Sequence, residues 1–331
     1  MSGAPAFSVL VTAYNRSREI ERCVRSAGAQ TFPDFEIVVV DDGSTDDTAA
    51  VLAAIAEPRL RTIAHPVNRG ISPARATTVS HARGEWLVML DSDWELLPNS
   101  LKRLSEIIAG ELQPGVRMIR SCLRWDNGMI SPSVVPLGIT DYTGRLQWLE
   151  AVWRSGGSSD AGHCVHRDVF AGTNYPTDRR GGIEVLWETN VARRERSLWV
   201  PDVLGLEHLD ADNSTTRDVS PARLVPRLLA EAQDLRWLAE TMLAEHGPAL
   251  IEHAPTYHRW LLKSALTETL LCGDRRAGVR CFRAARDAGA RERQLWATLA
   301  IGLLGPGLLA RAKLARRRRL VTRSRVARAP A

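Results

Sequence analysis

The chain has 331 residues, of which 44% are hydrophobic and 25% are charged, and its formal net charge is +6. This composition is typical of a globular protein with one large domain, or one domain and a substantial annex. Residues 311–331 hold nine Lys or Arg and no acidic residue. Without these nine charges the remaining chain carries −3, which argues against a nucleic-acid-binding domain.

The five cysteines are scattered and form no CxxC pair. This pattern argues against a disulfide framework and a structural zinc site, and it indicates a reducing compartment. The N-terminal residues lack the charged segment and apolar run of a signal peptide. No apolar run reaches the length of about 18 residues that a membrane span requires. We therefore expect a cytoplasmic protein, with a peripheral position on the inner face of the membrane left open.

The first 110 residues alternate between strand and helix patterns. Strands are expected at Phe7–Thr12, Glu36–Val40, Arg61–Ala64 and Trp86–Leu90. Helices are expected at 17–30, from 44 onward, at 72–84 and at 98–109, with Ser17, Ser44 and Ser72 as capping residues. This alternation predicts an α/β fold with a mostly parallel sheet and helices on both faces.

Polar residues follow three of the predicted strands, at the edge where an α/β sheet binds its ligands. Ala13–Arg16 follow the first strand, Asp41 and Asp42 the second, and Asp91–Asp93 the fourth. In an extended chain Asp91 and Asp93 point to the same side, which suits a hard divalent cation that holds a diphosphate. Taken alone this segment also fits a simple turn, and the three clusters together favour a site.

The second part of the chain has a weaker pattern. The Asn127-Gly128 pair predicts a hairpin between 116–125 and 129–135. We also expect helices at 147–154 and 184–194, a flexible loop at 155–162 and a strand at 199–204. From 221 the chain is predicted to be helical, with breaks near 247–248, 273–274 and 289.

Three motifs in this order carry a family resemblance: FSVLVTAYNR, EIVVVDDGSTDDT, and the stretch from Asn68 to Pro98 that contains LDSDWE. Together they resemble the family 2 glycosyltransferases of the GT-A fold, closely over residues 7–110 and weakly over parts of 162–214. The resemblance implies an inverting enzyme that transfers a sugar from a nucleotide-diphosphate sugar to an acceptor hydroxyl. It also implies a GT-A type Rossmann-like sheet with a helical C-terminal annex.

The resemblance implies a role for each strand-end cluster. One aspartate of the second cluster would hydrogen-bond the base, and an aspartate that accepts from an imide N–H favours uracil or thymine over purines. Arg75 would face the phosphates at a helix start, and Asp91 and Asp93 would bind Mn²⁺ or Mg²⁺ and the ribose. The residues expected to bind the nucleotide sugar are Thr12, Ala13, Tyr14, Asn15, Asp41, Asp42, Arg75, Asp91, Ser92 and Asp93.

An inverting transfer needs a carboxylate that removes the proton of the acceptor hydroxyl. The family places an acidic pair after a glycine-rich turn, and here Ile183 and Glu184 stand at these positions. We therefore expect Glu184 to be the base, with Glu188 and Asp178 as the alternatives. His208 matches a family histidine near the metal and is a further candidate ligand.

Two residues depart from the family pattern. Trp94 replaces an acidic residue that often follows the two aspartates, and Ala76 replaces an asparagine beside the arginine. Neither change removes a group that the chemistry requires, and both bear on donor preference.

We expect a glycosyltransferase domain over 1–215, with donor binding in 7–110 and the acceptor and base region in 111–215. A helical region at 216–310 and a basic tail at 311–331 follow. The apolar stretch Leu295–Leu309 beside this tail fits an anionic membrane surface, and equally a last core helix before a solvated tail. The acceptor is left open among a glycan, a lipid-linked compound and a small molecule, in cell-envelope glycan or natural-product biosynthesis. The sequence leaves two alternative functions, a sugar nucleotidyltransferase and a non-catalytic nucleotide-binding scaffold on membranes.

Overall fold

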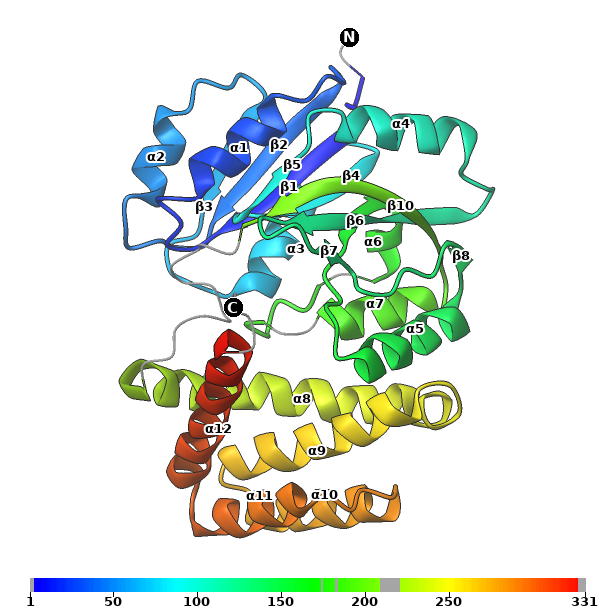
Figure 1. The fold of residues 1–331 in the computed structure, drawn as a ribbon. Helices are drawn as coiled ribbons and strands as arrows, with labels where there is room; N and C mark the ends of the chain where they lie inside the picture. The colour runs from blue at the N-terminus through cyan, green and yellow to red at the C-terminus, as the bar shows by residue number, and fades with distance from the viewer. Residues whose placement is uncertain (1–2, 174, 182–183, 209–220, 327–331) are drawn as a thin grey trace. The chain divides into compact units, whose positions relative to one another are not determined.

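The computed structural model describes residues 3–173, 175–181, 184–208 and 221–326. The chain forms two compact units, Met1–Asn213 and Ser214–Ala331. The first unit is an α/β structure around one sheet, and the second unit is helical (Figure 1).

The N-terminal unit contains a ten-stranded sheet with the order β3-β2-β1-β4-β9-β6-β10-β5, in which β7 also pairs with β6 and β8 with β10. The first four strands in this order are parallel, β9 is antiparallel to both of its neighbours, and β10 is parallel to β6. The strands are β1 (Phe7–Ala13), β2 (Phe35–Asp41), β3 (Leu60–Ala64), β4 (Trp86–Asp91), β5 (Trp94–Leu96), β6 (Val116–Trp125), β7 (Ile130–Ser131), β8 (Gly138–Thr140), β9 (Gly162–His166) and β10 (Arg196–Glu207).

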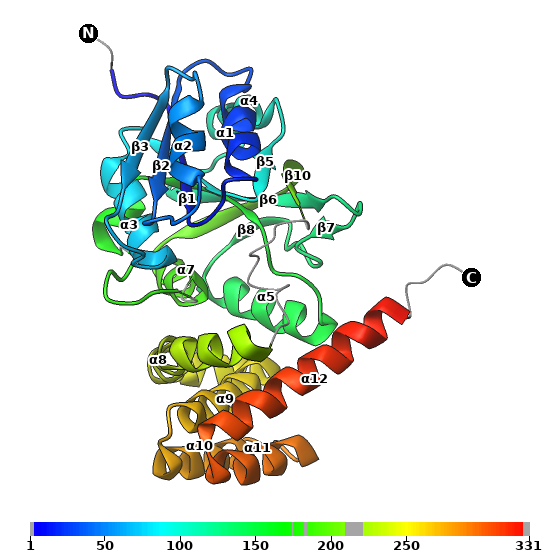
Figure 2. The ribbon, with the colours of Figure 1, turned by 90° about the vertical axis from the view of Figure 1, so that its left-hand side faces the viewer.

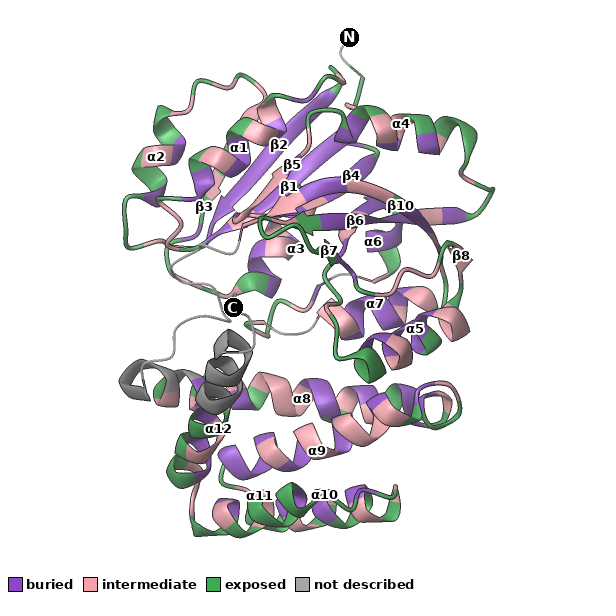
Figure 3. Ribbon diagram, viewed as in Figure 1, coloured by how far each residue is buried: buried purple, intermediate pink, exposed green. Residues whose placement is uncertain are grey.

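Helices cover both faces of this sheet, as the alternating pattern predicts. The helices are α1 (Ile20–Gly28), α2 (Thr48–Ala54), α3 (Ile71–His81), α4 (Ser100–Gly110), α5 (Tyr142–Ser155), α6 (Asp168–Gly172) and α7 (Glu184–Ala192). In β1, Val9 and Val11 pack with α1, α2 and α4, whereas Leu10 packs with α3, α6 and α7. The alternation follows from the two-residue period of a strand, and both faces are buried (Figure 3).

The serines expected at the N-caps of three helices do not occupy those positions. Helix α1 begins at Ile20 rather than after Ser17, and α2 has Asp47 at its cap position without a side-chain hydrogen bond. Helix α3 begins directly after Gly70, and Ser72 therefore lies inside the helix. Gly70 has a φ of 102°, a backbone conformation that glycine adopts readily and other residues rarely do. The hydroxyl of Ser44 is engaged elsewhere, because it accepts a hydrogen bond from the backbone of Asn15.

Several elements differ from the expectation. The loop expected up to residue 162 is followed by β9, and β5 was not predicted. Both are short strands whose pairing with β4, β6 and β10 stabilises them more than their local sequence does. Helix α5 starts earlier than expected because the Asp141 carboxylate accepts a hydrogen bond from the Gly144 backbone. The hairpin strand after Gly128 is short, since Pro132 cannot donate to the ladder.

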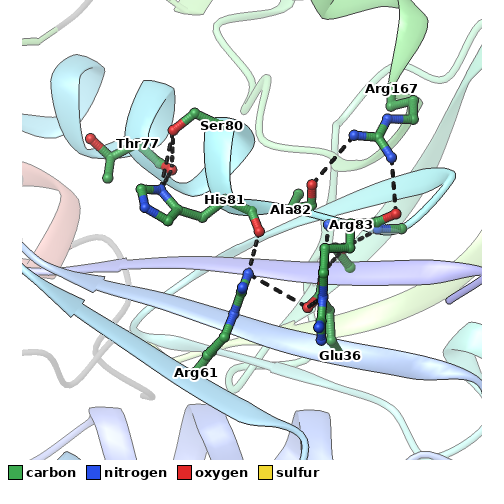
Figure 4. A network of polar contacts seen from close by, with 10 residues as sticks. Glu36, Arg61, Thr77, Ser80, His81, Ala82, Arg83 and Arg167 are labelled. Atoms are coloured by element: carbon green, nitrogen blue, oxygen red, sulfur yellow. Dashed lines mark hydrogen bonds and ion pairs between the residues drawn. The ribbon is translucent and has the colours of Figure 1, made fainter. Parts of the chain in front are cut away.

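A buried carboxylate ties β2 to the segment that connects α3 with β4 (Figure 4). Glu36 is only 3% exposed, and its Oε1 accepts hydrogen bonds from the Ser8 hydroxyl at 2.7 Å and the Arg83 backbone at 2.6 Å. Its Oε2 accepts from Arg83 Nε at 2.9 Å. Burial raises the pKa of Glu36, but the hydrogen bonds from Ser8 and Arg83 outweigh burial and hold the pKa below its ordinary value.

Replacing Glu36 by Gln is expected to lower the free energy of unfolding by about 1–3 kcal/mol at pH 7. The amide would turn an N–H group toward the donors of Arg83. A folded-state pKa below the unfolded value stabilises the protein above the ordinary glutamate pKa of about 4.3, and this stabilisation is lost as the pH falls through the folded pKa. Urea unfolding should therefore show a difference between wild type and variant that shrinks below this pH. The exposed Glu106→Gln serves as the control, and an equal effect at both sites would contradict the account.

The C-terminal unit is a bundle of five helices among its described residues (Figure 2). They are α8 (Pro221–His253), α9 (Pro255–Leu271), α10 (Arg275–Asp287), α11 (Arg293–Leu304) and α12 (Pro306–Val326). Leu266, Leu270 and Leu309 belong to its core. Glu268 is 4% exposed and pairs with Lys313 at 2.6 Å, which ties α9 to α12.

The breaks expected near 273–274 and 289 are confirmed, and the break at 247–248 is wrong. Gly273 and Gly289 have φ values of 81° and 89°, which end α9 and α10 in the left-handed region. Helix α8 instead continues through Pro248. Met242 and Leu250 are fully buried on either side of this proline, and their packing offsets the lost hydrogen bond.

Residues 306–326 form α12, so much of the basic tail is helical. Within the described part of the chain, every helix is either too short or too polar to cross a bilayer.

Candidate active site

The strand ends that carry the candidate residues lie side by side at one edge of the sheet. In the strand register Ala13 of β1 lies opposite Asp41 of β2, and Thr12 lies opposite Asp91 of β4. The parallel arrangement thus brings together the loops of the first two motifs and the acidic pair of the third.

Asn15 joins the loops that follow β1 and β2. It has a φ of 53°, and its backbone N–H donates to Ser44 Oγ at 2.9 Å. Its side-chain oxygen accepts from the Thr45 backbone at 2.8 Å. The neighbouring Tyr14 is 40% exposed, so its ring is accessible at the strand edge. Asn15 therefore connects the two candidate binding loops through hydrogen bonds.

The two adjacent aspartates after β2 have different surroundings. Asp42 uses both carboxylate oxygens within the protein: Oδ1 accepts from the Arg69 backbone at 3.0 Å and contacts His65 Nδ1 at 2.7 Å, and Oδ2 accepts from the Gly70 backbone at 2.7 Å. Asp42 thus stabilises the loop before α3 through these hydrogen bonds. Asp41 accepts one hydrogen bond through Oδ1, from the Ser44 backbone at 3.0 Å. Both side chains are nearly buried.

Arg75 links the acidic pair to the expected base. Its Nη2 donates to Asp91 Oδ1 at 2.9 Å, and its Nη1 donates to Glu184 Oε1 at 2.8 Å. Burial lowers the pKa of Arg75, but the charges of Asp91 and Glu184 outweigh burial and raise the pKa above its ordinary value. One guanidinium therefore holds carboxylates from β4 and from the first turn of α7.

Asp93 lies close to Asp91 and to two cationic or protonatable neighbours. Burial, and after it the charge of Asp91, raises the pKa of Asp93 above its ordinary value. Arg16 Nη2 lies 3.6 Å from Asp93 Oδ2. His208 donates its backbone N–H to the Asp93 carbonyl at 3.2 Å, while its Nε2 contacts Glu95 Oε1 at 2.5 Å. The imidazole of His208 is thus beside this cluster and engaged with Glu95.

The first alternative base, Glu188, is poorly suited to that role. It is 7% exposed and pairs with Arg145, with Arg120 at 3.3 Å and with His163 at 3.2 Å. Burial raises the pKa of Glu188, but Arg120 and Arg145 outweigh burial and lower it to about 2. Burial also lowers the pKa of His163 to about 4. A carboxylate with so low a pKa is a weak proton acceptor, and its contacts instead fix α7 to β6 and α5.

The second alternative, Asp178, has a side chain that is 71% exposed and lies 3.5 Å from Arg179. Its exposure sets it apart from the cluster around Arg75. Glu184 therefore remains the candidate whose carboxylate adjoins Arg75 and, through it, Asp91. Ile183 lies outside the described residues.

The structure places four further residues in or beside this cluster, to which the motifs gave no separate role. Arg16 and Glu95 lie beside candidate residues in the sequence. Their position after a predicted strand could therefore have marked them as site residues. Glu207 has its pKa raised to about 7 by burial and by the charges of Asp160, Asp93 and Asp91. Burial likewise raises the pKa of Asp160. Asp160 lies far from the other motifs in sequence, and only the folding of β9 beside β4 brings its segment to this edge.

Comparison with known proteins gives a family match within the N-terminal unit. Residues 8–113 match the family model described as Glycosyl transferase family 2. The chain is similar to the succinoglycan biosynthesis protein ExoO of Rhizobium meliloti, with 45% identity over 102 residues, which are 31% of this chain and 29% of that protein. It is also similar to the chondroitin synthase of Escherichia coli, with 43% identity over 100 residues, which are 30% of this chain and 14% of that protein. The matched stretch thus spans less than a third of these relatives' length.

Two solved structures share the fold over most of the chain. The structure of S. aureus TarS 1–349 in complex with UDP-GlcNAc has a TM-score of 0.55 at 18% identity, covering 85% of this chain and 90% of that one. The mannosyltransferase PcManGT of Pyrobaculum calidifontis, in complex with GDP-Man and Mn²⁺, has a TM-score of 0.54 at 20% identity, covering 94% and 87%. Residues 8–113 therefore form a glycosyltransferase family 2 domain, and the sheet with its surrounding helices has the GT-A fold.

Proposed function

We propose that this protein transfers a sugar from a UDP-linked donor to an acceptor hydroxyl with inversion at the anomeric carbon. The observation that carries the proposal is the bridge made by Arg75, which contacts Asp91 at 2.9 Å and Glu184 at 2.8 Å. Arg75 thus connects two groups. Asp91 belongs to the acidic pair that would face the donor diphosphate, and Glu184 is a carboxylate that can accept a proton. The bound donors of TarS and PcManGT support the use of a nucleotide sugar.

Glu184 would act as the general base of this transfer. Its Oε1 is oriented by Arg75, and the carboxylate would take the proton of the acceptor hydroxyl while the oxygen attacks the anomeric carbon. The bond from this carbon to the diphosphate breaks at the same time, so the configuration inverts. Arg75, in the first turns of α3, would then face the negative charge that develops on the diphosphate.

The residues at the strand edge fit a divalent cation. Asp91 and Asp93 are close enough for the charge of one to raise the pKa of the other, and a cation between them would relieve this repulsion. Mn²⁺ or Mg²⁺ bound by one or two carboxylates and the donor phosphates would neutralise the leaving diphosphate. His208 would join the ligands only by exchanging its contact with Glu95. Among the described residues there is no ready cluster of three His, Cys, Asp or Glu, so the donor phosphates would complete the coordination.

Asp41, rather than Asp42, is the proposed acceptor for the uracil imide N–H, since both oxygens of Asp42 already brace the loop before α3. Asp41→Asn is expected to weaken UDP binding about tenfold with little change in the melting temperature. Asp42→Asn is expected to lower the melting temperature, because its amide would face backbone donors. Titration calorimetry and thermal unfolding of both variants separate the two roles, and the reverse outcome would reject the assignment.

The family resemblance indicates only that the acceptor carries a hydroxyl group, and it does not name the compound. A glycan, a lipid-linked compound or a small molecule each supplies the hydroxyl that Glu184 would deprotonate. The similarity to ExoO and to chondroitin synthase supports a polysaccharide or cell-envelope glycan.

A nucleotide-release assay tests the proposal. The protein is incubated with Mn²⁺ and a panel of nucleotide sugars, and the released nucleoside diphosphate is measured with and without EDTA and with candidate acceptors. Release of UDP from one donor, dependent on metal and stimulated by an acceptor, is expected. Formation of pyrophosphate from a nucleoside triphosphate and a sugar phosphate would instead identify a nucleotidyltransferase.

A further inference from the structure

The outward face of α11 is apolar over most of its length. After the exposed Arg293 and Gln294 at its start, its exposed residues are Trp296, Ala297, Ala300, Leu303 and Leu304, and Leu308 continues this face at the start of α12. Leu304 is 71% exposed, and Leu308 is 51% exposed. Surface helices of globular proteins ordinarily place polar residues on this face, so a contiguous apolar stripe indicates a binding surface.

Trp296 is held in place on this face. Its ring lies 4.6 Å from the ring of Phe282 in an edge-to-face contact, and the guanidinium of Arg286 lies 5.6 Å from its centroid. The side chain is nevertheless 53% exposed. A fixed, half-exposed indole is typical of residues at the boundary between water and lipid, where an apolar ring and a polar N–H are both accommodated.

The same part of the chain is strongly basic. Residues 293–331 contain no acidic residue, and they hold Arg293 and the nine cations of 311–331. No charged residue lies between Arg293 and Arg311, so the apolar face is bounded by positive charge at both ends. Arg311 and Arg316 are exposed on α12, which follows α11 directly after Gly305.

We propose that α11 and α12 dock the protein on an anionic lipid bilayer. The exposed leucines and Trp296 would enter the interface between headgroups and acyl chains, and the arginines of α12 would contact the acidic headgroups. The contact is peripheral, because α11 is too short and too broken by Gly305 and Pro306 to span a bilayer.

A second copy of the chain is the other occupant that such a face could take. In a two-fold dimer the same patch faces itself, so the basic residues of both copies would be brought together. The uncompensated positive charge of 293–331 opposes this arrangement and favours a negatively charged surface. Charge complementarity therefore selects the bilayer.

Cosedimentation with vesicles tests the proposal on the full chain, without nucleotide or acceptor, so its outcome does not depend on the transfer reaction. The vesicles are phosphatidylcholine alone or with about 30% phosphatidylserine, at low and high salt. Wild type is expected to bind the anionic vesicles at least about tenfold more tightly, with a marked loss at high salt. The double variant Leu304→Gln, Leu308→Gln is expected to lose about tenfold or more in affinity.

Two matched controls separate docking from general effects. Ile251→Gln changes an apolar side chain on α8 that is 59% exposed, and it should bind vesicles as wild type does. Replacing Arg317, Arg318 and Arg319 by Gln should weaken binding, whereas the same change at the exposed Arg275, Arg276 and Arg280 of α10 should have less effect. Absence of wild-type binding to anionic vesicles at low salt would overturn the proposal. So would a dimer that the leucine variant dissociates while vesicle binding stays unchanged.

Discussion

Replacing Glu184 by Gln is expected to lower the rate of sugar transfer by about 10²- to 10⁴-fold while donor affinity stays unchanged. The amide has nearly the same shape, and its oxygen can still accept from Arg75 Nη1, which contacts Glu184 Oε1 at 2.8 Å in the wild type. It cannot accept a proton from the acceptor hydroxyl at neutral pH. The loss should therefore fall on kcat, measured by nucleotide release at saturating donor and acceptor.

Asp178→Asn provides the matched control for this variant. Its carboxylate lies in the segment before α7 and is 71% exposed, so removing its charge should leave kcat within about twofold of wild type. A Glu184→Gln enzyme that retains wild-type turnover would show that another group removes the proton. A parallel loss of UDP affinity would show that the substitution damages the donor site rather than proton transfer.

Replacing Asp93 by Asn is expected to abolish the effect of Mn²⁺ on donor binding and to reduce transfer by about 100-fold or more. The neutral amide removes one of the two charges that would hold the cation. It also removes the repulsion between Asp93 and Asp91, which together with burial raises the pKa of Asp93 in the wild type. Function should thus fall without a loss of thermal stability. Calorimetric titration of UDP with and without Mn²⁺, combined with thermal unfolding, measures both effects.

Ser92→Ala is the control for Asp93→Asn. Ser92 lies in the turn between the two aspartates and is 5% exposed. It carries no charge that would hold a cation, so its replacement is expected to matter little although the motif places it in the donor-binding segment. Metal-dependent UDP binding should survive this change. Equal losses in both variants would mean that the segment tolerates no substitution, and retained metal dependence in Asp93→Asn would exclude Asp93 as a ligand.

The sheet and the strand-end clusters could be predicted from the sequence because their signals are local. Apolar runs such as 7–12 and 36–40 are buried on both faces of a parallel sheet, and the polar residues that follow them lie at one edge by topology alone. Helix starts were less predictable. At Ser17 and Ser72 the local capping preference did not decide the start, and α3 begins after Gly70, which has a positive φ.

The contacts within the site could not be read from the sequence. The bridge from Arg75 to Asp91 and Glu184 joins residues that lie 16 and 109 positions apart, and no spacing rule predicts it. The different surroundings of Asp41 and Asp42 depend on backbone donors of the loop before α3, which only the folded chain supplies. For the same reason the sequence alone does not exclude Glu188 as a base, because its ion pairs with Arg120 and Arg145 form only in the folded chain.

A crystal structure with UDP and Mn²⁺, with the metal located by its anomalous scattering, would show whether the donor and the cation bind at the carboxyl ends of β1, β2 and β4. We expect a metal peak within coordination distance of the Asp93 carboxylate and the diphosphate oxygens, and a uracil ring whose imide N–H faces Asp41. A nucleotide bound away from the carboxyl ends of β1, β2 and β4, or a metal held by residues other than Asp91 and Asp93, would contradict this expectation.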